Sequence, residues 1–264
     1  MADIRLITST ANPAIKEIKA LEMRKRRKET SLFVAEGLRT IIEGMELGAE
    51  LETLVFSSDV KERPDVIRAS GYAKTAIEVN DMVLEKISRK ENPQSVIGVF
   101  KQKLQTLINV TPNGTWVVLE EVRDPGNLGT IIRTIDSVGA KGVILIGNCC
   151  DPYSFESVRA TMGSIFLVPI ITATRDEFIT WRTDWPGKVY GTTLQNSVDY
   201  READYKEPIL IIMGNEQAGM TDELRDICTS LIRLPMKGRA DSLNLSIATG
   251  VMLYMIEDRL TERK

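Results

Sequence analysis

Three polar loops carry the residue types in this sequence that could do chemistry. All three offer backbone amides, carboxamides and carboxyl or hydroxyl oxygens. None of them joins a nucleophile to a base or gathers a metal-ligand set. Their chemistry therefore favours a neutral-to-cationic ligand that is held by backbone groups and by shape. The polar residues in question are, in chain order, Asp124, Asn127, Asn215, Glu216, Gln217, Ser242 and Asn244.

Each loop leaves two interpretations open. Asn127 is expected to cap a helix from Leu128 to Val138, with Arg133 less than two turns farther on. That pattern indicates either an ordinary capped helix or a helix start that holds an anion or a nucleic-acid phosphate. The second loop follows "ILIIM" and is either a plain connection or a ligand site at the end of a parallel strand. In the third loop Ser242 and Asn244 either cap the following helix or hold a ligand, with Ser242 expected as the N-cap and Asn244 in the first turn.

The sequence also excludes several classes of site. It contains no histidine, which excludes Ser-His-Asp and Cys-His nucleophiles and any His-ligated metal. The three cysteines, Cys149, Cys150 and Cys228, have neither a disulfide framework nor a metal spacing. Neither GxxxxGK[ST] nor GxGxxG occurs, so nucleotide hydrolysis and dinucleotide binding are disfavoured. We therefore expect no metal.

The elements that must position the three loops lie in residues 114–264. Short apolar runs rich in Val and Ile alternate there with amphipathic helical patterns. Continuously apolar strands are typical of a parallel sheet that helices cover on both faces. The expected strands are "WVVLE", "VILI", "FLVPI", "KVYGTT", "ILIIM" and "LIRL".

Residues 1–104 are predicted to form a smaller mixed α/β domain, and residues 105–113 a linker. One helix is expected over residues 12–28, with Asn12 as its N-cap and Pro13 at its first position. The basic run "RKRRK" would end this helix, where the helix dipole favours positive charge. Such a run is either a solvated face or a contact with phosphates.

Composition is that of a globular chain, with 43% hydrophobic and 27% charged residues. No apolar stretch approaches the roughly 20 residues that a membrane span needs, and the N-terminus shows no signal-peptide pattern. We therefore expect a cytoplasmic protein with no membrane partner.

The three loops together resemble the SpoU (TrmH-like) family of RNA ribose 2'-O-methyltransferases, within the SPOUT class. The first signature is "DPGNLGTIIRTIDSVGAKGVIL", the second "IIMGNEQAG" and the third "LPMKGRADSLNLSIATGVMLY". The segment "ESVRATMGSIFLVPI" and the N-terminal "NPAIKEIKAL" and "LFVAEGLRTIIEG" are similar to other parts of the family. The N-terminal part resembles its ribosomal-protein-L30e-like domain, which binds substrate.

The resemblance implies roles for particular residues of this chain. Gln217 departs from the family, which commonly has glycine after the acid of the second signature. Thr192 is a weaker correspondence than the others. The implied catalytic residues are Asn127, Arg133, Glu216 and Asn244. The implied cofactor-binding residues are Thr192, Gly214, Leu234, Met236, Ser242 and Leu243. The candidate RNA-binding residues are Lys16, Arg24, Lys25, Arg26, Arg27, Lys28, Arg159, Lys237 and Arg239.

The resemblance further implies a C-terminal trefoil knot, S-adenosylmethionine as cofactor, and a homodimer in which each site lies near the partner's first-signature helix. The substrate would be structured RNA, in the first place ribosomal RNA, and not DNA, because the target is a ribose 2'-hydroxyl. Arginine keeps its proton at physiological pH and is a poor base. We therefore expect Arg133 to bind the adjacent phosphate and stabilise the developing alkoxide.

Two rival functions fit the same resemblance. One is an RNA-binding or ribosome-assembly factor that kept the fold without the chemistry. Five residues of the signatures speak against it, all of them present: Asn127, Arg133, Glu216, Ser242 and Asn244. The other is an antibiotic-resistance methyltransferase, which shares the reaction and differs in its target nucleotide.

Overall fold

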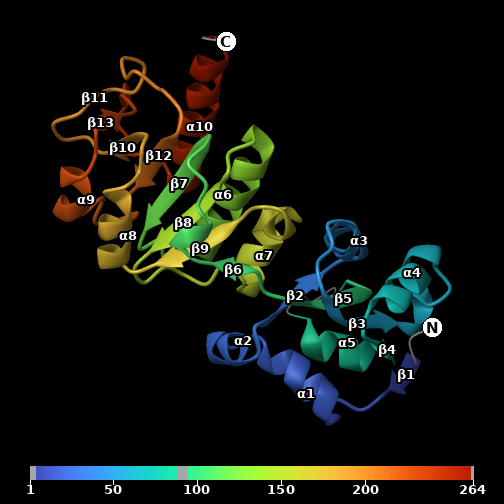
Figure 1. The fold of residues 1–264 in the computed structure, drawn as a ribbon. Helices are drawn as coiled ribbons and strands as arrows, with labels where there is room; N and C mark the ends of the chain where they lie inside the picture. Colours follow the sequence, from blue (N-terminus) through green and yellow to red (C-terminus); the bar gives the residue numbers. More distant parts are fainter. Residues whose placement is uncertain (1–3, 89–93, 263–264) are drawn as a thin grey trace. The chain divides into compact units, whose positions relative to one another are not determined.

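The computed structural model describes residues 4–88 and 94–262 of the chain. Residues 1–3, 89–93 and 263–264 of the two expected domains lie outside the described residues. The chain forms two compact units, each described here by itself (Figure 1). Unit 1 combines the chain up to Gln102 with the segment Asp151–Phe166, and unit 2 combines Lys103–Cys150 with the chain from Leu167 onward.

Unit 1 is built on a five-stranded mixed sheet in the order β1-β4-β3-β5-β2. Strands β1, β4 and β3 run parallel, and β5 is antiparallel to both β3 and β2. The strands are β1 (Ile4–Ile7), β2 (Leu32–Glu36), β3 (Leu51–Ser57), β4 (Thr75–Val79) and β5 (Val96–Lys101). The helices are α1 (Pro13–Ala20), α2 (Arg24–Thr30), α3 (Leu38–Glu46), α4 (Pro64–Tyr72) and α5 (Asp81–Ile87), with a 3-10 turn at Ser58–Val60.

The single helix expected over residues 12–28 is two helices, which corrects the prediction. Asn12 does cap α1, since its side chain accepts a hydrogen bond from the Ala14 amide. The chain then turns at residues 21–23, and the basic run opens α2 instead of closing α1. The guanidinium of Arg27 donates to the backbone oxygens of Leu21 and Glu22, at 2.7 and 2.9 Å. These bonds satisfy carbonyls that a helix end leaves without partners.

The segment Asp151–Phe166 belongs to unit 1 although it follows strand β8 of unit 2 in sequence. It contains α7 (Phe155–Thr161), capped by Ser154, and a 3-10 turn at Ser164–Phe166. Tyr153 packs on Phe33 and Phe166 packs on Phe100, with ring centroids 4.7 Å apart in both pairs. Asp151 lies 2.8 Å from the guanidinium of Arg27, and this ion pair is almost wholly buried. The segment therefore completes the core of unit 1.

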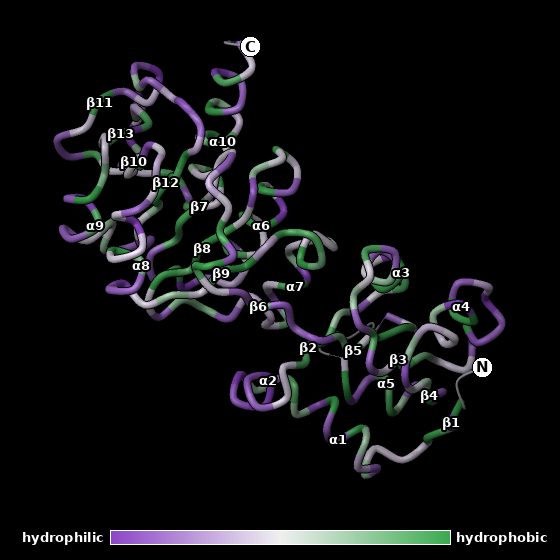
Figure 2. Tube along the Cα trace, in the orientation of Figure 1, coloured by the Kyte–Doolittle hydropathy of each residue, from purple (hydrophilic) through white to green (hydrophobic). Residues whose placement is uncertain are grey.

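Unit 2 contains an eight-stranded sheet in the order β11-β13-β10-β12-β7-β8-β9-β6, in which every strand pair is parallel. The central strands are buried along their length, and Figure 2 shows β8 as hydrophobic. The strands are β6 (Leu104–Gln105), β7 (Thr115–Glu120), β8 (Gly142–Ile146), β9 (Ile170–Ala173), β10 (Lys188–Thr192), β11 (Val198–Asp199), β12 (Ile209–Met213) and β13 (Ser230–Arg233). The parallel sheet predicted from the apolar runs is confirmed.

The remaining helices of unit 2 are α6 (Pro125–Val138), α8 (Arg175–Arg182), α9 (Asp222–Asp226) and α10 (Leu245–Thr261). Helix α10 packs against α6, and its Glu257 accepts a hydrogen bond from Thr115 at the start of β7. The strand expected at residues 166–170 begins only at Ile170, because a 3-10 turn occupies residues 164–166. The trefoil knot stays a prediction.

The stretch 105–113, expected as a linker, is structured. Strand β6 pairs with β9, a 3-10 turn follows at Leu107–Asn109, and Val110 is buried in the core of unit 2. Here the boundary between the compact units falls after Gln102.

The buried ion pair of unit 1 leads to a stability prediction. Arg27→Ala should lower the free energy of unfolding by about 3–5 kcal/mol, because it leaves the Asp151 carboxylate buried without its partner. Urea unfolding followed by circular dichroism measures the change. The exposed neighbour Lys28→Ala is the matched control and should change stability by less than about 0.5 kcal/mol. Equal effects of the two substitutions would show that the pair adds no stability.

Candidate functional site

Unit 2 holds an open cleft of about 900 Å³ at the carboxyl ends of β7, β10, β12 and β13. Parallel strands end at the same edge of a sheet, so the loops that follow them meet there. The three polar loops of the sequence and the turn after β10 form its walls. Its lining includes residues 192–195, 213–220 and 241–245, together with Arg123, Asp124 and Asn127.

A chain of side-chain hydrogen bonds joins the three loops at this cleft. Glu216 accepts from the side-chain amide of Asn127 at 3.4 Å. Its carboxylate also accepts from the backbone amides of Arg123 and Asp124, at 3.3 and 3.4 Å. Asn127 in turn accepts from the side-chain amide of Asn244 at 2.9 Å. The expected convergence of the three loops is therefore present in the structure.

The N-cap of α6 is Asp124, not Asn127 as the sequence predicted. The Asp124 carboxylate accepts from the Asn127 amide at 2.6 Å, and Pro125 occupies the first helical position. An aspartate before a proline is a favoured helix start. Because Asp124 caps the helix, the Asn127 side chain in the first turn is free to join the other two loops.

The N-cap of α10 is Asn244, which corrects the prediction of Ser242. The Asn244 side-chain oxygen accepts from the backbone amides of Ser246 and Ile247, at 2.9 and 3.4 Å. Ser242 lies two residues before the cap, is exposed, and lines the cleft. One asparagine thus caps the helix with its oxygen and reaches Asn127 with its nitrogen.

The second loop is tightly closed. Asn215 and Gly219 exchange two backbone hydrogen bonds of 3.0 Å, and the Asn215 side-chain oxygen accepts from the amides of Gln217 and Ala218. A Cβ on Gly214 would lie 2.3 Å from the Met220 nitrogen, so only glycine fits there. Gln217 is exposed at the cleft.

The expected cofactor-binding residues all line the cleft: Thr192, Gly214, Leu234, Met236, Ser242 and Leu243. The Thr192 hydroxyl donates to the Ile212 carbonyl at 3.1 Å. Arg133 is exposed on α6 and is not among the lining residues of the described chain. Lys237 and Arg239 are exposed in the loop before α10, and they too lie outside the lining.

The basic residues of unit 1 that are expected to bind RNA differ in their exposure. Lys16, Arg24, Lys25 and Lys28 are exposed, as is Arg159 on α7. Arg26 is half-buried and bonded to Glu17 and Glu29, and the ion pairs raise its pKa above the ordinary value. Arg27 is 5% exposed and bound to Asp151, which leaves it no open face for a phosphate. The phosphate prediction therefore does not fit Arg27.

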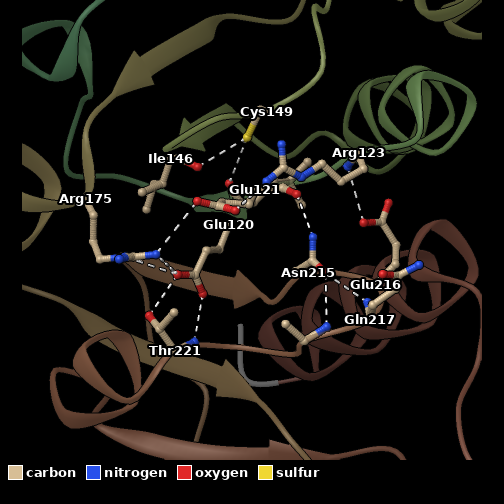
Figure 3. A network of polar contacts seen from close by, with 12 residues as sticks. Glu120, Glu121, Arg123, Ile146, Cys149, Arg175, Asn215, Glu216, Gln217 and Thr221 are labelled. Carbon is tan, nitrogen blue, oxygen red and sulfur yellow. Dashed lines mark hydrogen bonds and ion pairs between the residues drawn. The ribbon is translucent and has the colours of Figure 1, made fainter.

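Sequence reasoning missed a buried acid that bonds to Thr221, directly after the second loop (Figure 3). Glu120, the last residue of β7, is 2% exposed and pairs with Arg175 of α8. Its neighbour Glu121 pairs with Arg123 at 2.7 Å. The one sequence signal for Glu120 is a charge at the end of an otherwise apolar strand.

The cysteines do not supply a reactive group to the site. Burial raises the pKa of the Cys149 thiol to about 11 and that of Cys228 to about 12. Both thiols therefore stay protonated at neutral pH, whereas a nucleophile or metal ligand would be a thiolate. Across residues 4–88 and 94–262, no three acidic or cysteine side chains gather where they could hold a metal ion. No helix in the same residues is long and apolar enough to span a membrane.

A parallel sheet whose carboxyl edge carries a cleft of three linked polar loops defines a ligand-binding α/β domain. The sequence pattern of the SpoU rRNA Methylase family matches residues 114–254 of it. The chain therefore belongs to the SpoU rRNA Methylase family. Residues 12–98 match the MRM3-like substrate binding domain.

Several relatives are similar over nearly their whole length. The 23S rRNA (guanosine(2553)-2'-O)-methyltransferase RlmP of Bacillus subtilis (strain 168) is 28% identical over 95% of this chain and 98% of its own. The 23S rRNA (uridine(2479)-2'-O)-methyltransferase of Streptomyces viridochromogenes is 29% identical over 91% and 88% of the two chains. The crystal structure of an AdoMet-bound rRNA methyltransferase from Sinorhizobium meliloti is 46% identical over 97% and 98%, with a TM-score of 0.91.

Proposed function

We propose that this chain transfers the methyl group of S-adenosylmethionine to a ribose 2'-hydroxyl of ribosomal RNA. The observation that carries the proposal is the hydrogen-bonded chain Glu216, Asn127 and Asn244, which joins the three family signatures at one cleft. The names of the two curated relatives and the AdoMet-bound structure support the reaction class and the cofactor.

The cleft fits S-adenosylmethionine in size and chemistry. Its volume of about 900 Å³ is within the range of small-molecule sites. Leu234, Met236 and Leu243 offer apolar surface, and the Glu216 carboxylate suits a cationic ligand. Gly214 lets the second loop close against the cleft, because a Cβ there would collide with the backbone of Gly219 and Met220. When bound, the cofactor supplies a methyl group on a positively charged sulfur.

The polar chain gives each side chain a role in this proposal. Glu216 contacts the first loop through two backbone amides, and Asn127 links that loop to Asn244. The three side chains therefore hold the walls of the cleft in register, and positioning of two reactants can supply roughly 7–11 kcal/mol of catalysis. Arg133 lies outside the lining of its own cleft, so it is proposed to act at the site of a second copy, where it binds the phosphate beside the target ribose and stabilises the alkoxide that forms. The hydroxyl proton passes to a phosphate oxygen or to water.

Unit 1 is proposed to bind the RNA substrate, as its match to a substrate-binding domain suggests. Arg24, Lys25 and Lys28 on α2 and Lys16 on α1 are exposed cations that suit a phosphate backbone. Lys237 and Arg239 are proposed as further RNA contacts in unit 2, and Arg159 as one in unit 1. The two curated relatives act on different nucleotides, so the proposal names the class of RNA and no position.

We also propose a homodimer. Ile247, Val251 and Tyr254 are 56%, 41% and 51% exposed, and their spacing of four and three residues places them on one face of α10. An apolar helix face of this kind suits the same face of a second copy in a two-fold dimer. The cytoplasm is the proposed location.

A substitution at Asn244 tests the polar chain. Asn244→Asp keeps the oxygen that caps α10 but replaces the amide that donates to Asn127 with a second oxygen. Methyl transfer from tritiated S-adenosylmethionine to ribosomal RNA should fall about 100-fold. Asn244→Ala would also remove the cap, at a cost of about 1 kcal/mol of stability.

The matched control for this test is Asn148→Asp, which makes the same charge change at an exposed residue outside the cleft lining. Both proteins should keep the wild-type melting temperature within a few degrees, and the control should keep its activity. Near-normal methyl transfer by Asn244→Asp would show that the Asn244 amide is not needed for the reaction.

Mixed dimers test the proposed assembly. Arg133→Ala and Asn244→Asp should each be inactive alone. If Arg133 serves the partner's site, unfolding and refolding an equal mixture should restore about a quarter of the wild-type activity, because half of the two-fold dimers contain one complete site. A mixture no more active than its components would contradict the shared site, and analytical ultracentrifugation gives the assembly state independently.

Salt dependence tests the RNA contacts of α2. Replacing Arg24, Lys25 and Lys28 together with Gln should lower the slope of log affinity against log salt by about three, one unit for each lost phosphate contact. Filter binding of transcribed 23S rRNA measures the slope. The control replaces Lys61, Arg68 and Lys74, which pair with Glu78, Glu46 and Glu52. An equal drop of the slope in the control would mean that the cations of α2 make no specific contact with RNA phosphates.

A further inference from the structure

Both oxygens of the buried Glu120 carboxylate accept hydrogen bonds from residues that follow other strands, Arg175 of α8 and Thr221 before α9. One oxygen accepts from the Thr221 hydroxyl at 2.8 Å and from the Arg175 guanidinium at 3.0 and 3.3 Å. The other oxygen accepts from the Thr221 backbone amide at 2.9 Å. Because the group is 2% exposed and its donors are all within the protein, it is not placed to exchange a proton with a substrate.

The Thr221 hydroxyl bonds to Glu120 and does not cap the helix that follows it. It is the N-cap residue of α9, and threonine in that position ordinarily accepts a bond from the helix through its hydroxyl oxygen. Its side chain makes no such capping bond here. The hydroxyl instead donates to Glu120, which lies 101 residues earlier in the chain.

The first residue of the second loop, Asn215, is bonded to Glu121, which follows Glu120 directly after β7. The Asn215 side-chain amide donates to the Glu121 carbonyl at 2.8 Å (Figure 3). The loop from Asn215 to Thr221 is therefore held at both ends by the dipeptide 120–121. Between these ends lies Glu216, whose own bonds to the first loop are long, at 3.3 to 3.4 Å. Such long bonds do not by themselves fix the loop.

We propose that Glu120 is a positioning residue for the methyl-donor site. Together with Arg175 it holds Thr221 and so sets the conformation of the loop 214–220 that lines the cleft. This inference rests on the proposed function. In this proposal Glu120, which lies outside the cleft lining, contributes to the affinity for S-adenosylmethionine and has little effect on kcat.

The test compares Thr221→Val with Thr221→Ser by calorimetry with S-adenosylmethionine and by steady-state kinetics. Valine removes the donor hydroxyl at nearly constant volume, and serine keeps it. We expect Thr221→Val to raise the Kd about tenfold, or about 1.4 kcal/mol, with kcat at saturation within about threefold of wild type. Thr221→Ser should stay within about twofold in Kd.

Thr183→Val is the matched control, because its hydroxyl donates only to the Thr180 carbonyl at the far end of α8. It should leave the Kd unchanged. An unchanged Kd in a folded Thr221→Val would overturn the proposal, even if its melting temperature fell.

A second variant decides the matter should Thr221→Val not fold. Arg175→Lys keeps the charge beside Glu120 and removes the paired donors, and the proposal requires a Kd raised about threefold. An unchanged Kd in this variant overturns it. Failure of the wild-type protein to bind S-adenosylmethionine or to methylate RNA would instead overturn the proposed function, and this inference with it.

Discussion

The carboxamide of Asn127 is the interaction on which the arrangement of the cleft depends. The three loops leave three different strands, and the hydrogen bonds of the sheet end where the loops begin. A carboxamide carries its acceptor and its donors on separate atoms. Asn127 can therefore donate to Glu216 on one side and accept from Asn244 on the other. Neither a carboxylate nor a hydrocarbon of the same size could make both bonds.

The two flanking residues are each anchored by something other than the polar chain. Asn244 is fixed by capping α10, a helix whose buried side packs on α6. Glu216 is carried by a loop whose ends are bound to residues 120 and 121. The parallel sheet and the helix ends bring the three loops to one edge of the sheet, and the carboxamide of Asn127 links them there.

The sequence was informative where the pattern was local and less so where partners lay far apart. Continuous apolar runs predicted the parallel sheet, and Asn12 was correctly identified as a cap. For α6 and α10 the sequence pattern predicts the wrong cap, because Asp, Asn and Ser near a helix start cap it about equally well. The sequence pattern predicts a phosphate contact for Arg27 and no role for Glu120, because the partners that decide both lie 124 and 101 residues away. The convergence of the loops came from the resemblance, and the structure confirms it.

The placement of Asp151–Phe166 determines how this protein can be divided. A fragment that stops at residue 104 would have a gap where Tyr153 and Phe166 belong, and an arginine with no counter-ion in its interior. The complementary fragment would carry an aromatic arm with nothing to cover it. Exchange of unit 1 between relatives therefore needs three junctions, at residues 102, 150 and 166, rather than one. Recombination at a single point would separate the core of unit 1 from the segment Asp151–Phe166 that completes it.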